Sequence, residues 1–172
     1  TKLFPVFLLI CASSLHAEEP KERDEIAEKY KWDLTDMYVS TDRWEADILK
    51  YKVRLPEIES YKGRLGNNGK TLLAAIQKME EIEMLISDIF VYAGLKSYED
   101  MRVGENGANF SRARTLSTRY NEATSYMRPE LLAIPPKKLE KMIRSTKGLG
   151  IYRHFINEQL RMRGYTLSEA EE

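Results

Sequence analysis

A glycine-rich segment is the nearest approach in this sequence to a nucleotide-binding loop. It runs Gly63-Arg-Leu-Gly-Asn-Asn-Gly-Lys-Thr71, and its last three residues resemble the end of a phosphate-binding loop. Such a loop needs four residues between its outer glycines and a buried strand in front of it. Here five residues separate Gly63 from Gly69, and residues 57–62 continue a helical pattern. We therefore interpret the segment as a glycine-rich turn between two helices.

Residues that bind metals or act as nucleophiles are scarce. The chain has one cysteine, Cys11, and two histidines, His16 and His154, with no His-Glu-x-x-His and no paired cysteines. A catalytic zinc takes about three histidine, cysteine or carboxylate ligands. A lone histidine carries no motif, so we interpret His154 as a structural residue on a helix surface or half-buried. The sequence assigns no catalytic, cofactor-binding or metal-ligating residue.

Basic side chains close to tyrosines raise the possibility of nucleic-acid binding. Four arginines lie near Tyr120 and Tyr126: Arg112, Arg114, Arg119 and Arg128. A nucleic-acid surface needs a concentrated positive face that releases counterions from phosphates. The chain has 27 basic and 27 acidic side chains, with no net charge. We therefore expect no nucleic-acid partner.

The first residues have the composition of a secretory signal peptide. An apolar run over residues 3–12 follows Lys2 and precedes small residues that end at Ala17. The run is about ten residues long, too short for the roughly 20 that cross a bilayer as a helix. We predict cleavage after Ala17, which removes Cys11 and His16. The protein is then expected in the periplasm or outside the cell, without membrane contact after cleavage.

The elements that must position any site are predicted to be helices. Glycine and proline are absent from residues 70–93 and 108–128, and only Pro56 interrupts residues 22–60. Apolar residues recur every three or four positions in these intervals, which indicates one buried helix face each. The first set is Trp44, Ile48, Tyr51, Leu55 and Ile58. The pattern predicts three long helices and no strand.

N-cap residues and prolines predict where the three long helices begin and end. Ser40, Thr41 or Asp42 is expected to cap the first helix, and Pro56 to kink it near its end. The second is expected over residues 71–97 with Thr71 as its cap. The third carries an apolar stripe from Phe110 to Leu131, with Pro129 late in it. Shorter helices are expected around residues 139–143 and 151–160. The fold class is therefore all-α, an antiparallel helical bundle or stack of hairpins without a sheet.

The last residues predict the start of another helix. Ser168 and Glu171 have the spacing of a capping box, and acidic residues suit the first turn of a helix. An acidic, frayed tail is the alternative interpretation. The first residue is Thr1 rather than methionine. We interpret the chain as a fragment of a longer protein.

Six segments, in order, resemble the N-terminal part of the oligoendopeptidase F family, which is similar to the thimet oligopeptidases. The first three are Tyr-Lys-Trp-Asp-Leu-Thr-Asp-Met-Tyr at 30–38, followed by Trp44, then Leu-Pro-Glu-Ile-Glu-Ser-Tyr-Lys-Gly-Arg-Leu at 55–65, and Val-Tyr-Ala-Gly-Leu-Lys-Ser-Tyr-Glu-Asp at 91–100. The last three are Pro-Glu-Leu-Leu-Ala-Ile-Pro at 129–135, Tyr-Arg-His-Phe at 152–155, and Thr-Leu-Ser-Glu-Ala-Glu-Glu at 166–172. The resemblance implies an almost wholly helical zinc metallopeptidase. Its zinc ligands lie in a later His-Glu-x-x-His segment that this chain does not contain, so no cofactor is expected here and zinc is implied only for the full-length parent.

The resemblance also implies an organisation and a role. We expect a signal peptide at 1–17, an extended arm at 18–40, a helical N-terminal domain at 41–165, and the truncated start of a further helix at 166–172. The domain would form one wall of a channel that admits short peptides, with the missing C-terminal catalytic domain as its partner. By itself the fragment is expected to be inactive. The alternative is a stand-alone helical binding or scaffold protein of the cell envelope.

Overall fold

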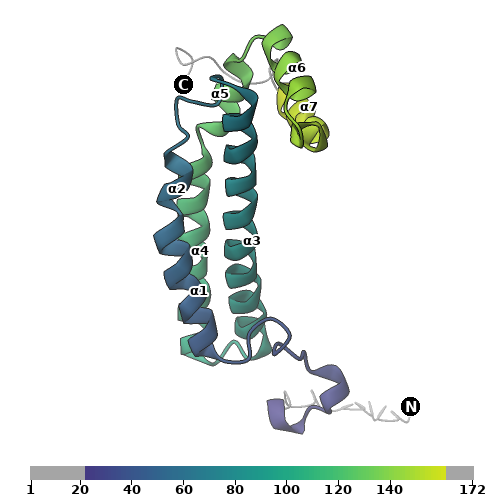
Figure 1. The fold of residues 1–172 in the computed structure, drawn as a ribbon. Helices are drawn as coiled ribbons and strands as arrows, with labels where there is room; N and C mark the ends of the chain where they lie inside the picture. Colours follow the sequence, from purple (N-terminus) through teal and green to yellow (C-terminus); the bar gives the residue numbers. More distant parts are fainter. Residues whose placement is uncertain (1–21, 162–172) are drawn as a thin grey trace, which may run out of the picture. The chain divides into compact units, whose positions relative to one another are not determined.

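The computed structural model describes residues 22–161 (Figure 1). The chain divides into two units between Lys31 and Trp32, so the described parts of the units are residues 22–31 and 32–161. The signal peptide predicted at 1–17 and the helix start predicted at 166–172 lie outside the described residues. In the first unit, the described residues form two short 3-10 helices, η1 (Arg23–Glu25) and η2 (Glu28–Tyr30). The second unit contains the helices that carry the site.

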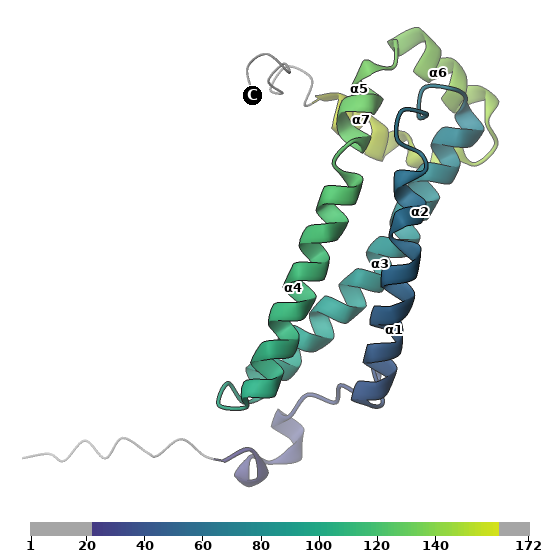
Figure 2. The same ribbon diagram turned by 90° about the vertical axis from the view of Figure 1, so that its left-hand side faces the viewer.

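All regular elements of the second unit are helices, and no strand occurs among residues 22–161. They are α1 (Thr41–Arg54), α2 (Pro56–Glu59), α3 (Gly69–Glu99), α4 (Gly104–Thr124), α5 (Met127–Ala133), α6 (Pro136–Ser145), η3 (Leu149–Tyr152) and α7 (Arg153–Arg161). Helices α1, α3 and α4 lie side by side, and α5, α6 and α7 gather near the α2 end of these helices (Figures 1 and 2). The all-α prediction with three long helices and shorter ones is confirmed.

The first predicted helix divides at its proline. Ser40 caps α1 by accepting a hydrogen bond from the backbone N–H of Arg43 at 3.4 Å. Pro56 is the first residue of α2, a position where its missing N–H costs nothing because that N–H would have no helical partner. The predicted kink is therefore the boundary between α1 and α2.

The longest helix begins two residues before its predicted start. The side chain of Asn68, not that of Thr71, caps α3 by accepting from the Thr71 backbone N–H at 2.9 Å. Asparagine is among the strongest N-cap residues because its short side-chain oxygen reaches the third helical N–H. With 31 residues, α3 is about 46 Å long.

The third predicted helix differs at both ends. The observed helix α4 begins at Gly104, before the glycine-free interval 108–128 from which the helix was predicted. Gly104 and Gly107 therefore lie in its first turns. Its stripe does not continue unbroken to Leu131, because α4 ends at Thr124 and α5 begins at Met127. The cause is Pro129, whose ring would clash with the carbonyl of the residue four positions earlier, Ser125.

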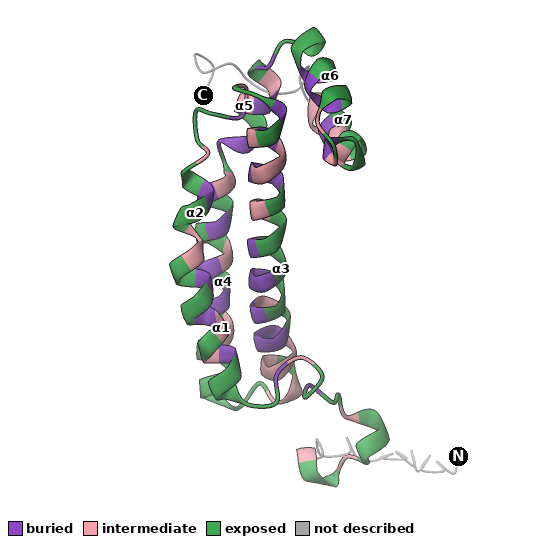
Figure 3. Ribbon diagram, in the orientation of Figure 1, coloured by how far each residue is buried: buried purple, intermediate pink, exposed green. Residues whose placement is uncertain are grey.

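Buried aromatic residues hold the long helices together. The indole N–H of Trp44 donates to the Ile89 carbonyl at 3.0 Å, which joins α1 to α3. The Tyr51 hydroxyl donates to the Leu116 carbonyl at 2.7 Å, which joins α1 to α4. Buried residues line the faces that the three helices turn toward one another (Figure 3). Among the described residues, no buried side-chain nitrogen or oxygen lacks a hydrogen-bond partner.

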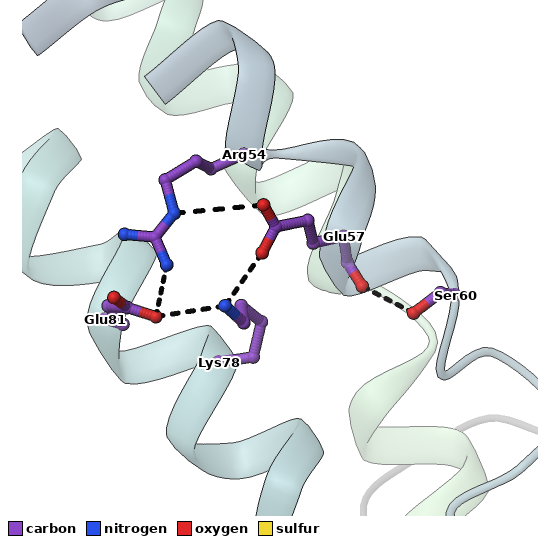
Figure 4. Close-up of polar contacts among 5 residues, drawn as sticks. All are labelled: Arg54, Glu57, Ser60, Lys78 and Glu81. Atoms are coloured by element: carbon purple, nitrogen blue, oxygen red, sulfur yellow. Dashed lines mark hydrogen bonds and ion pairs between the residues drawn. The ribbon is translucent and has the colours of Figure 1, made fainter. Parts of the chain in front are cut away.

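An ionic ring joins α1 and α2 to α3 on the outside of this core (Figure 4). Lys78 lies 2.7 Å from Glu57 and 3.1 Å from Glu81, and Arg54 lies 2.5 Å from Glu81 and 3.9 Å from Glu57. Hydrogen bonds from Arg54 and Lys78 lower the pKa of Glu81, and those to Glu57 and Glu81 raise the pKa of Lys78. Because the carboxylates are half-exposed, we assign the ring a role in helix register and little net stability.

Candidate functional site

A groove of about 990 Å³ lies between α3, the end of α4, α5 and α7. Its volume falls at the upper end of the range typical of small-ligand sites. The apolar lining comes from three helices: Leu72, Ile76 and Met79 of α3, Met127 and Leu131 of α5, and Phe155 of α7. Polar and charged side chains lie at its ends. It therefore combines an apolar floor with a few polar groups that could orient a ligand.

One end of the groove is acidic. The Tyr120 hydroxyl lies 3.3 Å from the Met79 carbonyl and 3.3 Å from a carboxylate oxygen of Glu83. Burial, and then the neighbouring Glu83 carboxylate, raise the pKa of Tyr120 well above its usual value. The phenol therefore stays protonated and donates, while Glu83 is exposed and presents its negative charge to the groove.

The opposite end of the groove is basic. Arg128 and Lys62 both line it, and the Arg128 Nε donates to the Gln159 side-chain oxygen at 2.8 Å. The turn that carries Lys62 is fastened to α5, because the Glu130 carboxylate accepts from the backbone N–H groups of Gly63 and, at 3.3 Å, of Leu65. The α2–α3 turn and the α5–α7 pair thus bring two cations together.

The glycine-rich segment occupies a turn between helices, as the sequence predicted. Gly63 has φ +75°, a left-handed conformation that glycine adopts without strain. Gly69 begins α3, and Asn68 caps it. The segment therefore reverses the chain between α2 and α3, and a buried strand does not precede it among the described residues.

The arginines singled out in the sequence do not form one basic face. Arg112 makes two hydrogen bonds to the Glu45 carboxylate, at 2.6 and 2.9 Å, and its guanidinium lies 5.3 Å from the centre of the Trp44 ring. This pair joins α4 to α1. Arg128 instead lines the groove. His154 is exposed on α7 and is not part of the groove lining.

The described part of the chain holds no group of three or more histidine, cysteine, aspartate or glutamate side chains that could hold a metal ion. The donor set of a zinc site is therefore not assembled between residues 22 and 161. Across the same residues, no helix combines the length and apolarity that a membrane span requires.

Sequence reasoning did not find Glu83, Arg128 and Gln159 as groove residues. The three residues come from α3, α5 and α7, and nothing in their local patterns links them. The one available signal was Pro129, which lies just beyond the division between α4 and α5. Residues 125–129, which span this break, all line the groove.

Comparison with known proteins places this chain among peptidase sequences. A family model described as oligopeptidase F matches residues 130–172. An oligoendopeptidase F homolog of Lactococcus lactis subsp. lactis is 30% identical over 153 residues, which cover 88% of this chain and 26% of the relative. Oligopeptidase PepF of Bacillus subtilis is 28% identical over 161 residues, which cover 94% of this chain and 24% of the relative.

Solved structures share the fold. Oligoendopeptidase-F from Enterococcus faecium superposes with a TM-score of 0.70 and 26% identity, over 76% of this chain and 25% of that one. A structure described as a peptidase of Chlamydophila abortus superposes with a TM-score of 0.74 over 86% of this chain and 25% of that one, at 24% identity, and shows similarity of fold alone. The chain spans about a quarter of the length of the curated relatives it matches.

Proposed function

Because this chain belongs to the oligoendopeptidase F family and corresponds to its N-terminal region, we propose that it forms one wall of the peptide channel of a longer zinc metallo-oligoendopeptidase. The observation that carries the proposal is the coverage, 88% of this chain against 26% of a 30% identical relative. The catalytic domain of such an enzyme would be the partner of this domain, and short peptides its substrates. The zinc and its His-Glu-x-x-His ligands would lie outside residues 22–161.

An exposed apolar stripe on α3 supports a partner domain. Met84, Val91 and Tyr98 follow one another at intervals of seven residues, which places them on one side of a helix. Their exposed fractions are 70%, 41% and 59%. Apolar side chains aligned in this way are typical of a surface that another domain covers. The stripe is a candidate contact surface for the rest of the longer protein.

The test of this proposal begins with the DNA beyond the codon for Glu172. We expect the reading frame to continue to a His-Glu-x-x-His segment, and the longer protein to cleave a quenched fluorescent oligopeptide. Replacing the glutamate of that segment by glutamine should abolish cleavage because the general base is lost. Residues 18–172 alone should give no turnover, since they contain one histidine and no cysteine. A stop codon directly after Glu172 would instead favour the stand-alone scaffold protein.

We further propose that the protein is exported, on the evidence of its first 17 residues. An apolar core behind Lys2 and a small residue at Ala17 are the features that an export pathway reads. Expression in a bacterium followed by N-terminal sequencing of the periplasmic fraction should place the new terminus at Glu18. Replacing Leu8 and Leu9 by arginine should keep the protein in the cytoplasm. Recovery of the unprocessed chain from the cytoplasm in both cases would contradict export.

A further inference from the structure

The groove between α3, α5 and α7 is larger than the voids that a packed protein leaves inside it. Its volume is about 990 Å³, whereas protein interiors contain few voids larger than a water molecule. Met79 of α3 and Phe155 of α7 line the groove and are only half-buried. An apolar lining of this kind is typical of a surface that another segment covers.

The chain leaves the described structure beside this groove. Helix α7 ends at Arg161, and its residues Phe155 and Gln159 belong to the groove lining. The Gln159 side-chain oxygen accepts from the Nε of Arg128 at 2.8 Å. Positions three or four residues apart share one face of a helix, so the next position in the series after Gln159 is Met162, again an apolar residue. Residues 162–172 therefore begin next to the groove.

The composition of residues 162–172 complements that of the groove. These residues supply three apolar side chains, one cation and three carboxylates: Met162, Tyr165, Leu167, Arg163, Glu169, Glu171 and Glu172. The groove lining contains an apolar floor, the cations Lys62 and Arg128, and the carboxylate of Glu83. An excess of carboxylates on one side and of cations on the other favours their association.

The two cations of the groove are available to these carboxylates. Among residues 22–161, no carboxylate forms an ion pair with Arg128 or Lys62. Gln159 binds only the Nε of Arg128, so the two terminal nitrogens of the guanidinium remain for a carboxylate. The acidic residues come after Gly164, and glycine suits a reversal of the chain. They can therefore return to Arg128, beside which the chain leaves α7.

We propose that residues 162–172 dock in this groove, with their apolar side chains over its floor and their carboxylates against Arg128 and Lys62. The match to the oligopeptidase F family model supports this docking, because it runs through residues 130–172 and so takes in α5, α6, α7 and the docking segment together. With its own chain in place, the groove is an internal contact surface. The inference does not depend on the proposed function.

The test places a nitroxide spin label on the docking segment of the whole chain. Cys11→Ser removes the natural thiol, and Ala170→Cys then carries the label. NMR signals of methionine methyl groups report where the label lies, because broadening by a nitroxide falls with the sixth power of distance. Met79 and Met127 line the groove, whereas Met101 does not and is 82% exposed. We expect strong broadening at Met79 and Met127 and none at Met101.

A second label position serves as the matched control. Glu105 is exposed in the first turn of α4, four residues after Met101. It lies fifteen residues before Tyr120, about 22 Å along the same helix, and the Tyr120 hydroxyl contacts the Met79 carbonyl. A label at Glu105→Cys should therefore broaden Met101 and spare Met79, which reverses the pattern.

A mixed sample separates docking within one chain from docking between two chains. It combines spin-labelled chains that carry no isotope with isotope-labelled chains that carry no spin label. We expect no broadening in this sample. Broadening of Met79 and Met127 here would show that a second copy occupies the groove, and it would overturn the proposal.

Charge-removing variants test the contacts with the carboxylates. Arg128→Gln with Lys62→Gln should lower the broadening at Met127 about twofold at 20 mM salt, because exposed ion pairs contribute modestly and are screened by salt. Replacing the three glutamates of the segment by glutamine should have the same effect, and combining both sets should add little, since both remove the same interaction. Arg114→Gln with Lys141→Gln removes two exposed cations outside the groove lining and should leave the broadening unchanged.

Two further results would contradict the docking. One is the absence of broadening at Met79 and Met127 in chains whose circular dichroism at 222 nm matches that of the wild type, which would leave the groove to an outside partner. The other is equal broadening at Met79, Met127 and Met101, which would mean that the segment has no fixed place. Neither result bears on peptidase activity in a longer protein, so the proposed function stands or falls separately.

Discussion

The substitution Gly69→Ala tests the packing of α6 against the start of α3. A Cβ atom at Gly69 would overlap the Oγ1 of Thr146 and would lie 3.0 Å from the Thr146 Cβ and 3.1 Å from the Met142 carbonyl oxygen. The carbonyl belongs to the backbone of α6, so it cannot rotate away as a side chain can. The two helices must therefore separate.

The expected magnitude is a balance of two effects. Overpacking of a well-filled contact costs about 1–3 kcal/mol, whereas alanine gains about 0.5–1 kcal/mol over glycine in a helix. Gly69→Ala should therefore lower the free energy of unfolding by about 1–2 kcal/mol. For a domain of this size that corresponds to a fall in Tm of roughly 3–6 °C.

Gly107→Ala is the matched control because a Cβ there meets nothing within 4 Å. It also lies in a helix, so only the helix preference acts and the variant should gain about 0.5–1 kcal/mol. Both variants are measured by urea and thermal unfolding followed by circular dichroism at 222 nm. Adding Thr146→Ala to Gly69→Ala removes the overlap with the Thr146 hydroxyl and should restore part of the lost stability. The restoration is only partial because the Met142 carbonyl oxygen still lies 3.1 Å from the new Cβ. Equal stability of Gly69→Ala and Gly107→Ala would refute the reasoning.

Three further predictions concern hydrogen bonds and charges. Burial raises the pKa of both Tyr51 and Tyr126 to about 12, so the folded chain keeps protons that the unfolded chain releases above pH 10. The contribution of these two tyrosines to stability should be constant below pH 10 and fall between pH 10 and 12, and urea titrations of Tyr51→Phe should show a shallower fall over that range. Lys78→Gln opens the ionic ring, so it should destabilise the protein at 20 mM salt and have little effect at 1 M, as thermal melts at both concentrations would show. Glu130→Gln leaves one acceptor for two backbone N–H groups, so stability should fall by about 1 kcal/mol and hydrogen exchange at Gly63 should accelerate.

Much of the fold could be predicted because helix signals act over one or two turns. The spacing of Trp44, Ile48 and Tyr51 predicts the buried face of α1, and all three are buried. Pro56 and Pro129 were expected late in their helices, and each coincides with a division of a helix in two. The error at the start of α3 arose from the same local range, because Asn68 and Thr71 both satisfy cap chemistry and only the backbone conformation decides between them.

The candidate site could not be predicted in the same way. Glu83, Arg128 and Gln159 line one groove only because α3, α5 and α7 are rotated and spaced as the core packs them. Each is an ordinary polar residue in its own helix. Their shared groove depends on contacts between residues more than thirty positions apart, such as Arg128 with Gln159 and Tyr120 with Glu83.

The sequence by itself determined that the chain is helical, where its prolines divide the helices, and which family it resembles. These properties depend on the order of neighbouring residues, since backbone hydrogen bonds and apolar periodicity operate within one helix. Tertiary structure alone decided that Arg112 pairs with Glu45, that Lys78 closes an ionic ring, and that Arg128 faces a groove with an acidic opposite end. The physical reason is that the partner of an exposed charge depends on how the helices rotate and cross, and close packing of buried side chains from several helices sets that geometry.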